Sequence, residues 1–129
     1  MRSYITRTDV NSFVWDDVDA WVKSKERTHL VQGVNILNLG SGHSYGMLAL
    51  QVNKRGCGYM IMASDDVYSA FNYVSDILLP GAVYDTVGYT QTVRKIHQIS
   101  MDTKAYVWFG HCVVQFRTLR KSHDGKFYT

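Results

Sequence analysis

Apolar positions in residues 11–27 recur at helical spacing. Val14, Val18, Trp21 and Val22 form one stripe at intervals of four, three and one residues, which is typical of an amphipathic helix. Asp16 and Asp17 lie near the start of this segment, as the helix dipole favours. The basic residues near its end, which the dipole also favours, are Lys23, Lys25 and Arg27. We therefore predict a helix here.

From residue 30 the pattern changes to short apolar runs separated by glycine. The runs cover residues 30–39, 47–52 and 59–63, and they predict strands. The sequence Asn-Lys-Arg-Gly at 53–56 predicts a hairpin turn, with Gly56 free to adopt positive φ. The segment GSGHSYG at 40–46 would then be the loop between two antiparallel strands.

The second half of the chain begins with another helical pattern. Ser64 precedes Val67, Phe71, Val74 and Leu78, which keep helical spacing until the Leu-Pro-Gly sequence that follows. Residues 89–100 fit a helix by their apolar spacing and a strand by their β-branched residues, so both alternatives stay open.

The C-terminal part is predicted to be extended. Residues 105–119 read as a long strand in which Gly110 marks a bulge, and Asp124-Gly125 predicts a turn into a last short strand. Together these elements predict an α+β fold: a mostly antiparallel sheet of about five strands with two helices packed on one face. Residues 1–129 are expected to form a single globular domain.

Composition favours a folded domain. The chain is 46% hydrophobic and contains one proline, and its N-terminus lacks the apolar segment of a secretory signal. No apolar run approaches the ~20 residues that a membrane span needs. Two cysteines are few for a secreted scaffold. We therefore expect a cytoplasmic location and no membrane partner.

The loop at 40–46 contains a match to the G-x-S-x-G nucleophile elbow. Ser44 occupies the nucleophile position between Gly42 and Gly46. Hydrolases with this elbow build it into a doubly wound sheet after several strands, and too few residues precede Ser44 for that. We therefore favour turn geometry for the glycines, with an anion-binding loop as a weaker alternative.

A thiol nucleophile or a metal site has little support in the spacing. Cys112 could act as a nucleophile with His43 or His97 as base, but it shares its side of the predicted strand with apolar residues. The five histidines show no metal-ligand spacing, and His111 would point away from Cys112. We expect no cofactor and no metal.

The charge is distributed unevenly. Residues 94–129 contain seven Lys or Arg against two Asp, a balance of +5, whereas the whole chain has a net charge of +3. In an extended segment several of these residues would form a basic strip that follows a nucleic-acid backbone. The candidate nucleic-acid-binding residues are His111, Arg117, Arg120, Lys121 and Lys126.

Nine tyrosines favour a protein-interaction surface, because tyrosine and arginine are common in interface hot spots. The candidate partner-binding residues are Tyr68, Tyr84, Tyr89 and Arg94. Our leading hypothesis is a small non-enzymatic protein that binds and modulates or inhibits a larger partner, such as a viral or mobile-element regulator. The alternatives are nucleic-acid binding through residues 94–129 and a small hydrolase with Ser44 or Cys112 as nucleophile. The oligomeric state stays open.

Overall fold

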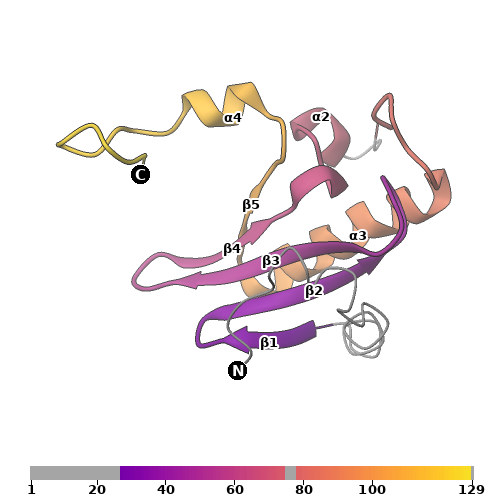
Figure 1. The fold of residues 1–129 in the computed structure, drawn as a ribbon, viewed down its shortest axis with the longest axis horizontal. Coiled ribbons are helices and arrows are strands. Elements are labelled where there is room, and N and C mark those ends of the chain that lie inside the picture. Colours follow the sequence, from indigo (N-terminus) through magenta and orange to yellow (C-terminus); the bar gives the residue numbers. More distant parts are fainter. Residues whose placement is uncertain (1–26, 75–77, 129) are drawn as a thin grey trace, which may run out of the picture.

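The structure is a computed structural model that describes residues 27–74 and 78–128 (Figure 1). In chain order its elements are β1 (Arg27–Val31), β2 (Val34–Gly40), β3 (Met47–Lys54), β4 (Gly58–Met62), a 3-10 turn η2 (Ser64–Asp66), α2 (Ala70–Tyr73), α3 (Thr86–Thr103), β5 (Tyr106–Trp108) and α4 (Val113–Arg117).

Five strands form one sheet in the order β1-β2-β3-β4-β5. The first four are joined by antiparallel pairing, and β5 pairs parallel with β4. The predicted α+β class with a mostly antiparallel sheet of about five strands is therefore confirmed, although the helices differ from those expected in number and bounds.

The turns between the first four strands follow the glycines. Gly56 has φ 78° in the β3–β4 turn, as predicted, and residues 40–46 link two antiparallel strands. Gly33 has φ 82° and divides the predicted strand 30–39, because its turn reverses the chain between β1 and β2.

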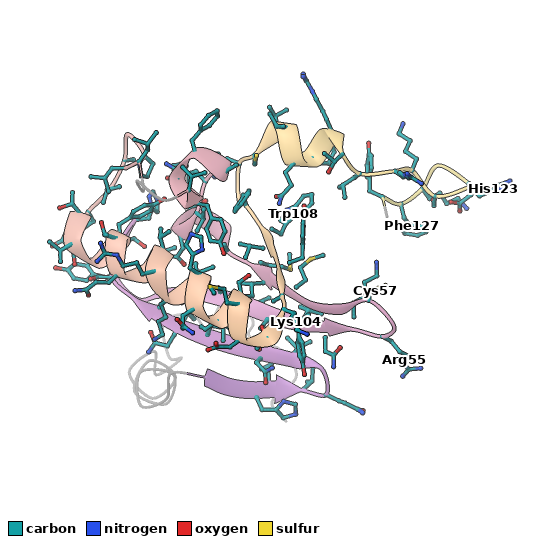
Figure 2. The ribbon with its side chains drawn as sticks, turned by 180° about the vertical axis from the view of Figure 1, so that it is seen from behind. Arg55, Cys57, Lys104, Trp108, His123 and Phe127 are labelled. Atoms are coloured by element: carbon teal, nitrogen blue, oxygen red, sulfur yellow. The ribbon has the colours of Figure 1, made fainter. Side chains whose placement is uncertain are left out.

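The core lies between the sheet and α3, which runs along one face of the sheet (Figures 1 and 2). Tyr89, Val93 and Ile96 are fully buried on the helix, and Leu37 and Ile61 meet them from the strands. The helix resolves the alternative left open for residues 89–100. The burial of Tyr89, Val93 and Ile96 against the sheet stabilises a helix in this segment, whereas local propensity favoured neither helix nor strand.

The helix predicted from Ser64 to Leu78 is largely wrong. Over the described residues 64–74 the chain makes the short turn η2 and the four-residue helix α2, with Val67 extended between them. The backbone carbonyls of Val67 and Tyr68 accept hydrogen bonds from Gly110 and His111, at 3.0 and 2.8 Å. These long-range bonds replace the bonds that a continuous helix would make.

The strand predicted over 105–119 is also wrong beyond Trp108. Residues 113–117 form α4, and the buried side chain of Gln115 holds this helix against β5. Its amide oxygen accepts from the Phe109 backbone N–H and its amide nitrogen donates to the Val107 carbonyl, both at 2.8 Å. The alternation of side chains in this segment was therefore a misleading sign of a strand.

Two further predictions concern the ends of the chain. The predicted helix over 11–27 lies outside the described residues, apart from Arg27, which begins β1. The predicted C-terminal turn is present, with Gly125 at φ 69° and a bridge between Lys121 and Tyr128. In the described ranges, no helix is long and apolar enough to cross a membrane.

The two faces of the sheet differ in burial. Ile61 points towards α3 and is fully buried, whereas the next residue, Met62, points to the opposite face and is 44% exposed. The face that carries Met62 has no helix layer of the described residues upon it (Figure 1).

We expect Ile61→Ala to lower the free energy of unfolding by about 2–5 kcal/mol, because it leaves a cavity in the core. The matched variant Met62→Ala removes a half-exposed side chain from the other face and is expected to cost less than about 1 kcal/mol. Urea unfolding followed by circular dichroism measures both. Equal losses would contradict the assignment of the two faces.

Candidate functional site

Three chemically versatile side chains follow the ends of three strands that run in the same direction. His43 follows β2, Asp65 follows β4 and His111 follows β5. Strands β2 and β4 both lie antiparallel to β3, and β5 is parallel to β4, so their carboxyl ends meet at one edge of the sheet. Ligand sites in open sheets with helices commonly form at such edges.

The loop that carries His43 is fixed to the start of α3. The Gly42 carbonyl accepts hydrogen bonds from the backbone N–H groups of Tyr84 and Asp85, at 3.1 and 2.9 Å. Asp85 caps α3 by accepting from the Gly88 N–H, and the Ser41 hydroxyl donates to the same carboxylate. These bonds lower the pKa of Asp85, with the Gly88 bond as the main cause.

The ring of His43 is oriented by the backbone. Its Nδ1 lies 2.9 Å from the Ala82 carbonyl, which can only accept, so Nδ1 carries the proton of the neutral ring. Its Nε2 faces Asp65 Oδ2 at 3.7 Å. A histidine that donates one nitrogen to a carbonyl and presents the other to a site has the usual arrangement of a metal ligand.

Asp65 stands between the two histidines. His111 Nε2 lies 2.8 Å from Oδ1, while His43 lies on the side of Oδ2. The carboxylate is half-buried. Ser64, just before it, has φ 51°, a left-handed conformation that costs energy for a residue with a Cβ and is found most often where function requires it.

The position of His111 depends on a close approach of two backbones. A Cβ on Gly110 would lie 2.3 Å from the Ser64 carbonyl oxygen, so only glycine fits there. This approach and the hydrogen bond from the His111 N–H to the Tyr68 carbonyl place the imidazole beside Asp65.

Tyr68 lies between the two imidazoles. Its hydroxyl is 2.8 Å from His43 Nδ1, and its ring meets that of His111 edge-on with centroids 4.9 Å apart. Burial, and then the charge of Asp65, raise the pKa of Tyr68. The phenol therefore stays protonated at neutral pH and is available as a hydrogen-bond donor.

Two imidazoles and one carboxylate are the donor types that bind zinc and similar divalent metals. Within residues 27–74 and 78–128, however, no three such side chains are placed to hold a metal ion by themselves. The histidines face different oxygens of Asp65 rather than one common point. The chemistry of the donor set fits a metal, but the set needs further ligands.

A second carboxylate is buried directly behind Asp65. Asp66 is fully buried, and among the residues that the structure describes neither of its oxygens has a hydrogen-bond partner. The buried Tyr89 hydroxyl likewise has no hydrogen-bond partner among them. Burial raises the pKa of Asp66 to about 7, opposed by the nearby His43. Burial and the charge of Asp66 also raise the pKa of Tyr89, to about 12.

The two candidate nucleophiles are not placed for catalysis. Ser44 is exposed, and its hydroxyl hydrogen bonds are to Met47 Sδ and the Tyr45 carbonyl, neither of which is a base. Cys112 precedes α4 and lines an apolar pocket of about 410 Å³ that contains neither His43 nor His97. Backbone hydrogen bonds, that of Ala70 first, lower the pKa of Cys112.

The four candidate partner-binding residues are dispersed. Tyr68 lies in the site described above, and Tyr89 is fully buried in the core, where it offers no surface to a partner. Tyr84 is exposed and shares a hydrogen bond between hydroxyls with Tyr45. Arg94 is exposed on α3.

The predicted basic strip does not form, because α4 interrupts the segment that was expected to be extended. His111 lies beside Asp65, and Arg117 lies at the end of α4. Arg120, Lys121 and Lys126 are exposed in the C-terminal segment, which extends away from the sheet with His123 and Phe127 (Figure 2).

Two known enzymes resemble nearly the whole chain. They are N-acyl homoserine lactonases AiiB, from Agrobacterium fabrum strain C58 and Rhizobium rhizogenes strain K84, each 34% identical over 135 residues. The match covers 97% of this chain and 49% of each relative, so the chain spans about half the length of the curated relatives it matches. No family model matches the chain.

Solved structures share the fold. An N-acyl homoserine lactone hydrolase with its product N-hexanoyl-L-homoserine at the catalytic metal centre has a TM-score of 0.68 at 22% identity, over 81% of this chain and 40% of that chain. AiiA from B. thuringiensis, with N-decanoyl-L-homoserine in its active site, gives the same values. A probable metal-dependent hydrolase from Staphylococcus aureus has a TM-score of 0.52 at 14% identity, over 68% of this chain and 31% of that chain.

These findings correct the functional prediction. The hypothesis of a small non-enzymatic interaction protein, acting as an inhibitor or as a viral regulator, is wrong, because the relatives that match almost the whole chain are lactone-hydrolysing enzymes. The inference from tyrosine content and from the lack of a familiar catalytic motif failed because the site is built from residues far apart in sequence.

The sequence held a signal for this site that we did not use. Each of the three apolar runs that became β2, β4 and β5 is followed within a few residues by a histidine or aspartate. The sequence suggested His43 only as a base for Cys112, and it gave no catalytic role to Asp65. The signal needed the strand directions, which the sequence alone did not give.

The buried carboxylate gives a pH-dependent stability. Because its folded pKa of about 7 lies above the ordinary aspartate value of 3.8, Asp66 destabilises the fold progressively as pH rises from about 4 to 7. We expect Asp66→Asn to remove this component and to make the chain more stable at pH 8, by up to about 4 kcal/mol. Urea unfolding at several values between pH 4.5 and 8.5 measures the free energy of unfolding of each protein. Asp102→Asn, at an exposed position, is the control; an identical pH slope in wild type and Asp66→Asn would refute the claim.

Proposed function

We propose that the chain forms part of a metal-dependent hydrolase that opens the lactone ring of N-acyl homoserine lactones. The observation that carries the proposal is the convergence of His43, Asp65 and His111 at one sheet edge, in a chain 34% identical to two N-acyl homoserine lactonases. The product bound at the metal centre of a structural neighbour supports the same substrate class.

His43, Asp65 and His111 are the residues that would hold a metal ion, together with ligands from outside the described residues. A divalent metal at such a site polarises a carbonyl oxygen and makes water a better nucleophile near neutral pH. Other residues of this chain orient these side chains. The Ala82 carbonyl fixes the ring of His43, and Gly110 allows the close backbone approach that brings His111 to Asp65.

Tyr68 supplies a hydrogen-bond donor to the substrate. In lactone hydrolysis water adds to the carbonyl carbon, the ring C–O bond breaks, and the departing oxygen takes up a proton to become a hydroxyl. Negative charge builds up on oxygen during both steps, so a fixed donor stabilises the transition state. The Tyr68 hydroxyl is positioned beside His43 for this role and stays protonated because its pKa is raised.

The experiment uses a chimaera in which this chain replaces the matched half of the Agrobacterium fabrum relative. We expect it, loaded with zinc, to hydrolyse N-hexanoyl homoserine lactone. We expect His43→Ala, Asp65→Asn and His111→Ala each to lower kcat/KM at least about 100-fold, since each removes a group that acts at the reaction centre. Chromatographic measurement of ring opening gives the rates.

His123→Ala is the matched control, because His123 is an exposed histidine of the C-terminal segment, far from the site (Figure 2). Its rate should stay within about twofold of the wild type. A chimaera that unfolds cooperatively and binds zinc but does not open the lactone would contradict the proposed function.

A further inference from the structure

The short helix α2 determines where two groups of the candidate site lie. Tyr68 precedes this helix by two residues, and the Tyr68 carbonyl accepts a hydrogen bond from the His111 backbone N–H, at 2.8 Å. A helix of only four residues, Ala70–Tyr73, does not hold its conformation by itself. The positions of Tyr68 and His111 therefore depend on the contacts that fix α2 to the rest of the fold.

His97 makes such a contact from α3. Its ring stacks on that of Tyr73, the last residue of α2, with centroids 3.7 Å apart and planes 9° from parallel. Its Nε2 also bonds to the Tyr73 backbone carbonyl, which lies at the helix end and has no partner within the helix. Because a carbonyl only accepts, Nε2 carries the proton. One side chain of an 18-residue helix thus fixes both the ring and the backbone at the end of α2.

The Tyr73 ring continues this contact towards His111. It meets the Phe109 ring with centroids 5.3 Å apart, and Phe109 stands two residues before His111. The hydroxyl end of Tyr73 is held by a side-chain hydrogen bond with Ser100, which also belongs to α3. Tyr73 and Phe109 are half-buried and pack against the core. His97, Tyr73 and Phe109 therefore connect the rigid helix α3 to the segment that carries His111.

His43 is held by different contacts. Its loop is bonded to the start of α3 through the Gly42 carbonyl, and its ring is bonded to the Ala82 carbonyl. Both bonds are made outside α2. A change at His97 is therefore expected to displace Tyr68 and the His111 backbone while it leaves the backbone of the His43 loop in place. This asymmetry distinguishes a positioning role from a general contribution to stability.

We propose that His97 is a positioning residue for lactone hydrolysis: through Tyr73 it sets the positions of the Tyr68 hydroxyl and of the His111 backbone. His97 acts on the reaction through these groups and not by contact with the substrate. The effect on catalysis rests on the proposed function, whereas the effect on the His111 backbone is a property of this fold and is measured separately.

The zinc-loaded chimaera with the Agrobacterium fabrum relative tests the effect on catalysis. We expect His97→Leu to lower kcat for N-hexanoyl homoserine lactone at least about tenfold and to change KM less than about twofold, because the Tyr68 donor acts on charge that develops in the transition state. His97→Gln keeps an N–H donor for the Tyr73 carbonyl and should restore kcat to within about threefold of the wild type. His123→Leu, the same substitution at an exposed histidine, should change neither constant.

Amide hydrogen exchange of the same chimaera, measured by NMR without substrate or metal, tests the effect on the backbone. The His111 N–H bonds to the Tyr68 carbonyl, and the Asp85 N–H bonds to the Gly42 carbonyl. We expect His97→Leu to accelerate exchange at His111 at least about fivefold, because local opening of α2 breaks its hydrogen bond. Exchange at Asp85 should not change.

His97→Phe replaces His97→Leu if the latter unfolds the chimaera, because it keeps a ring against Tyr73 and removes only the bond to the Tyr73 carbonyl. Three outcomes would overturn the proposal: a folded variant with kcat within about twofold of the wild type, unchanged exchange at His111, or equal acceleration at His111 and Asp85. A chimaera that opens no lactone, but in which the variant accelerates exchange at His111 alone, would contradict the proposed function and support the positioning of the His111 backbone.

Discussion

The parallel pairing of β5 with β4 is the constraint on which the site depends. Met60, Ile61 and Met62 pair in register with Tyr106, Val107 and Trp108, so the two strands end together. A parallel connection needs a long crossover, and α3 lies within it, covering one face of the sheet. The same pairing therefore creates the core on one side and brings the loops that carry Asp65 and His111 to a common edge.

At that edge the backbone is held in arrangements that stability alone does not favour. Gly110 approaches the Ser64 carbonyl too closely for any Cβ, and Ser64 has a left-handed backbone. Asp66 is buried with no hydrogen-bond partner within residues 27–74 and 78–128. The left-handed Ser64 and the buried Asp66 each cost free energy, and they lie directly beside Asp65, whose two oxygens face the two imidazoles. Several energetically unfavourable backbone and side-chain arrangements within a few residues are typical of a functional site.

The sequence was informative where local chemistry determined structure and uninformative where distant contacts did. Glycines predicted the turn at Gly56 and the loop at 40–46, and the apolar runs predicted the antiparallel strands. The strand over 105–119 failed because Gln115 makes long-range bonds to β5, and the helix from Ser64 failed because Val67 pairs with Gly110. His43 lies one residue before Ser44, so the motif at 42–46 indicated the loop of the candidate site but not its histidine.

The proposed function requires that His43 and His111 bind one metal site together with Asp65. Long-range proton–nitrogen NMR spectra of the histidine rings, recorded while the chimaera with the Agrobacterium fabrum relative is titrated with zinc, test this proposal at single-residue resolution. We expect the Nε2 signals of His43 and His111 to shift together while those of His97 and His123 do not, and we expect Asp65→Asn to weaken this response. Shifts confined to the exposed His123, or unchanged in Asp65→Asn, would contradict it.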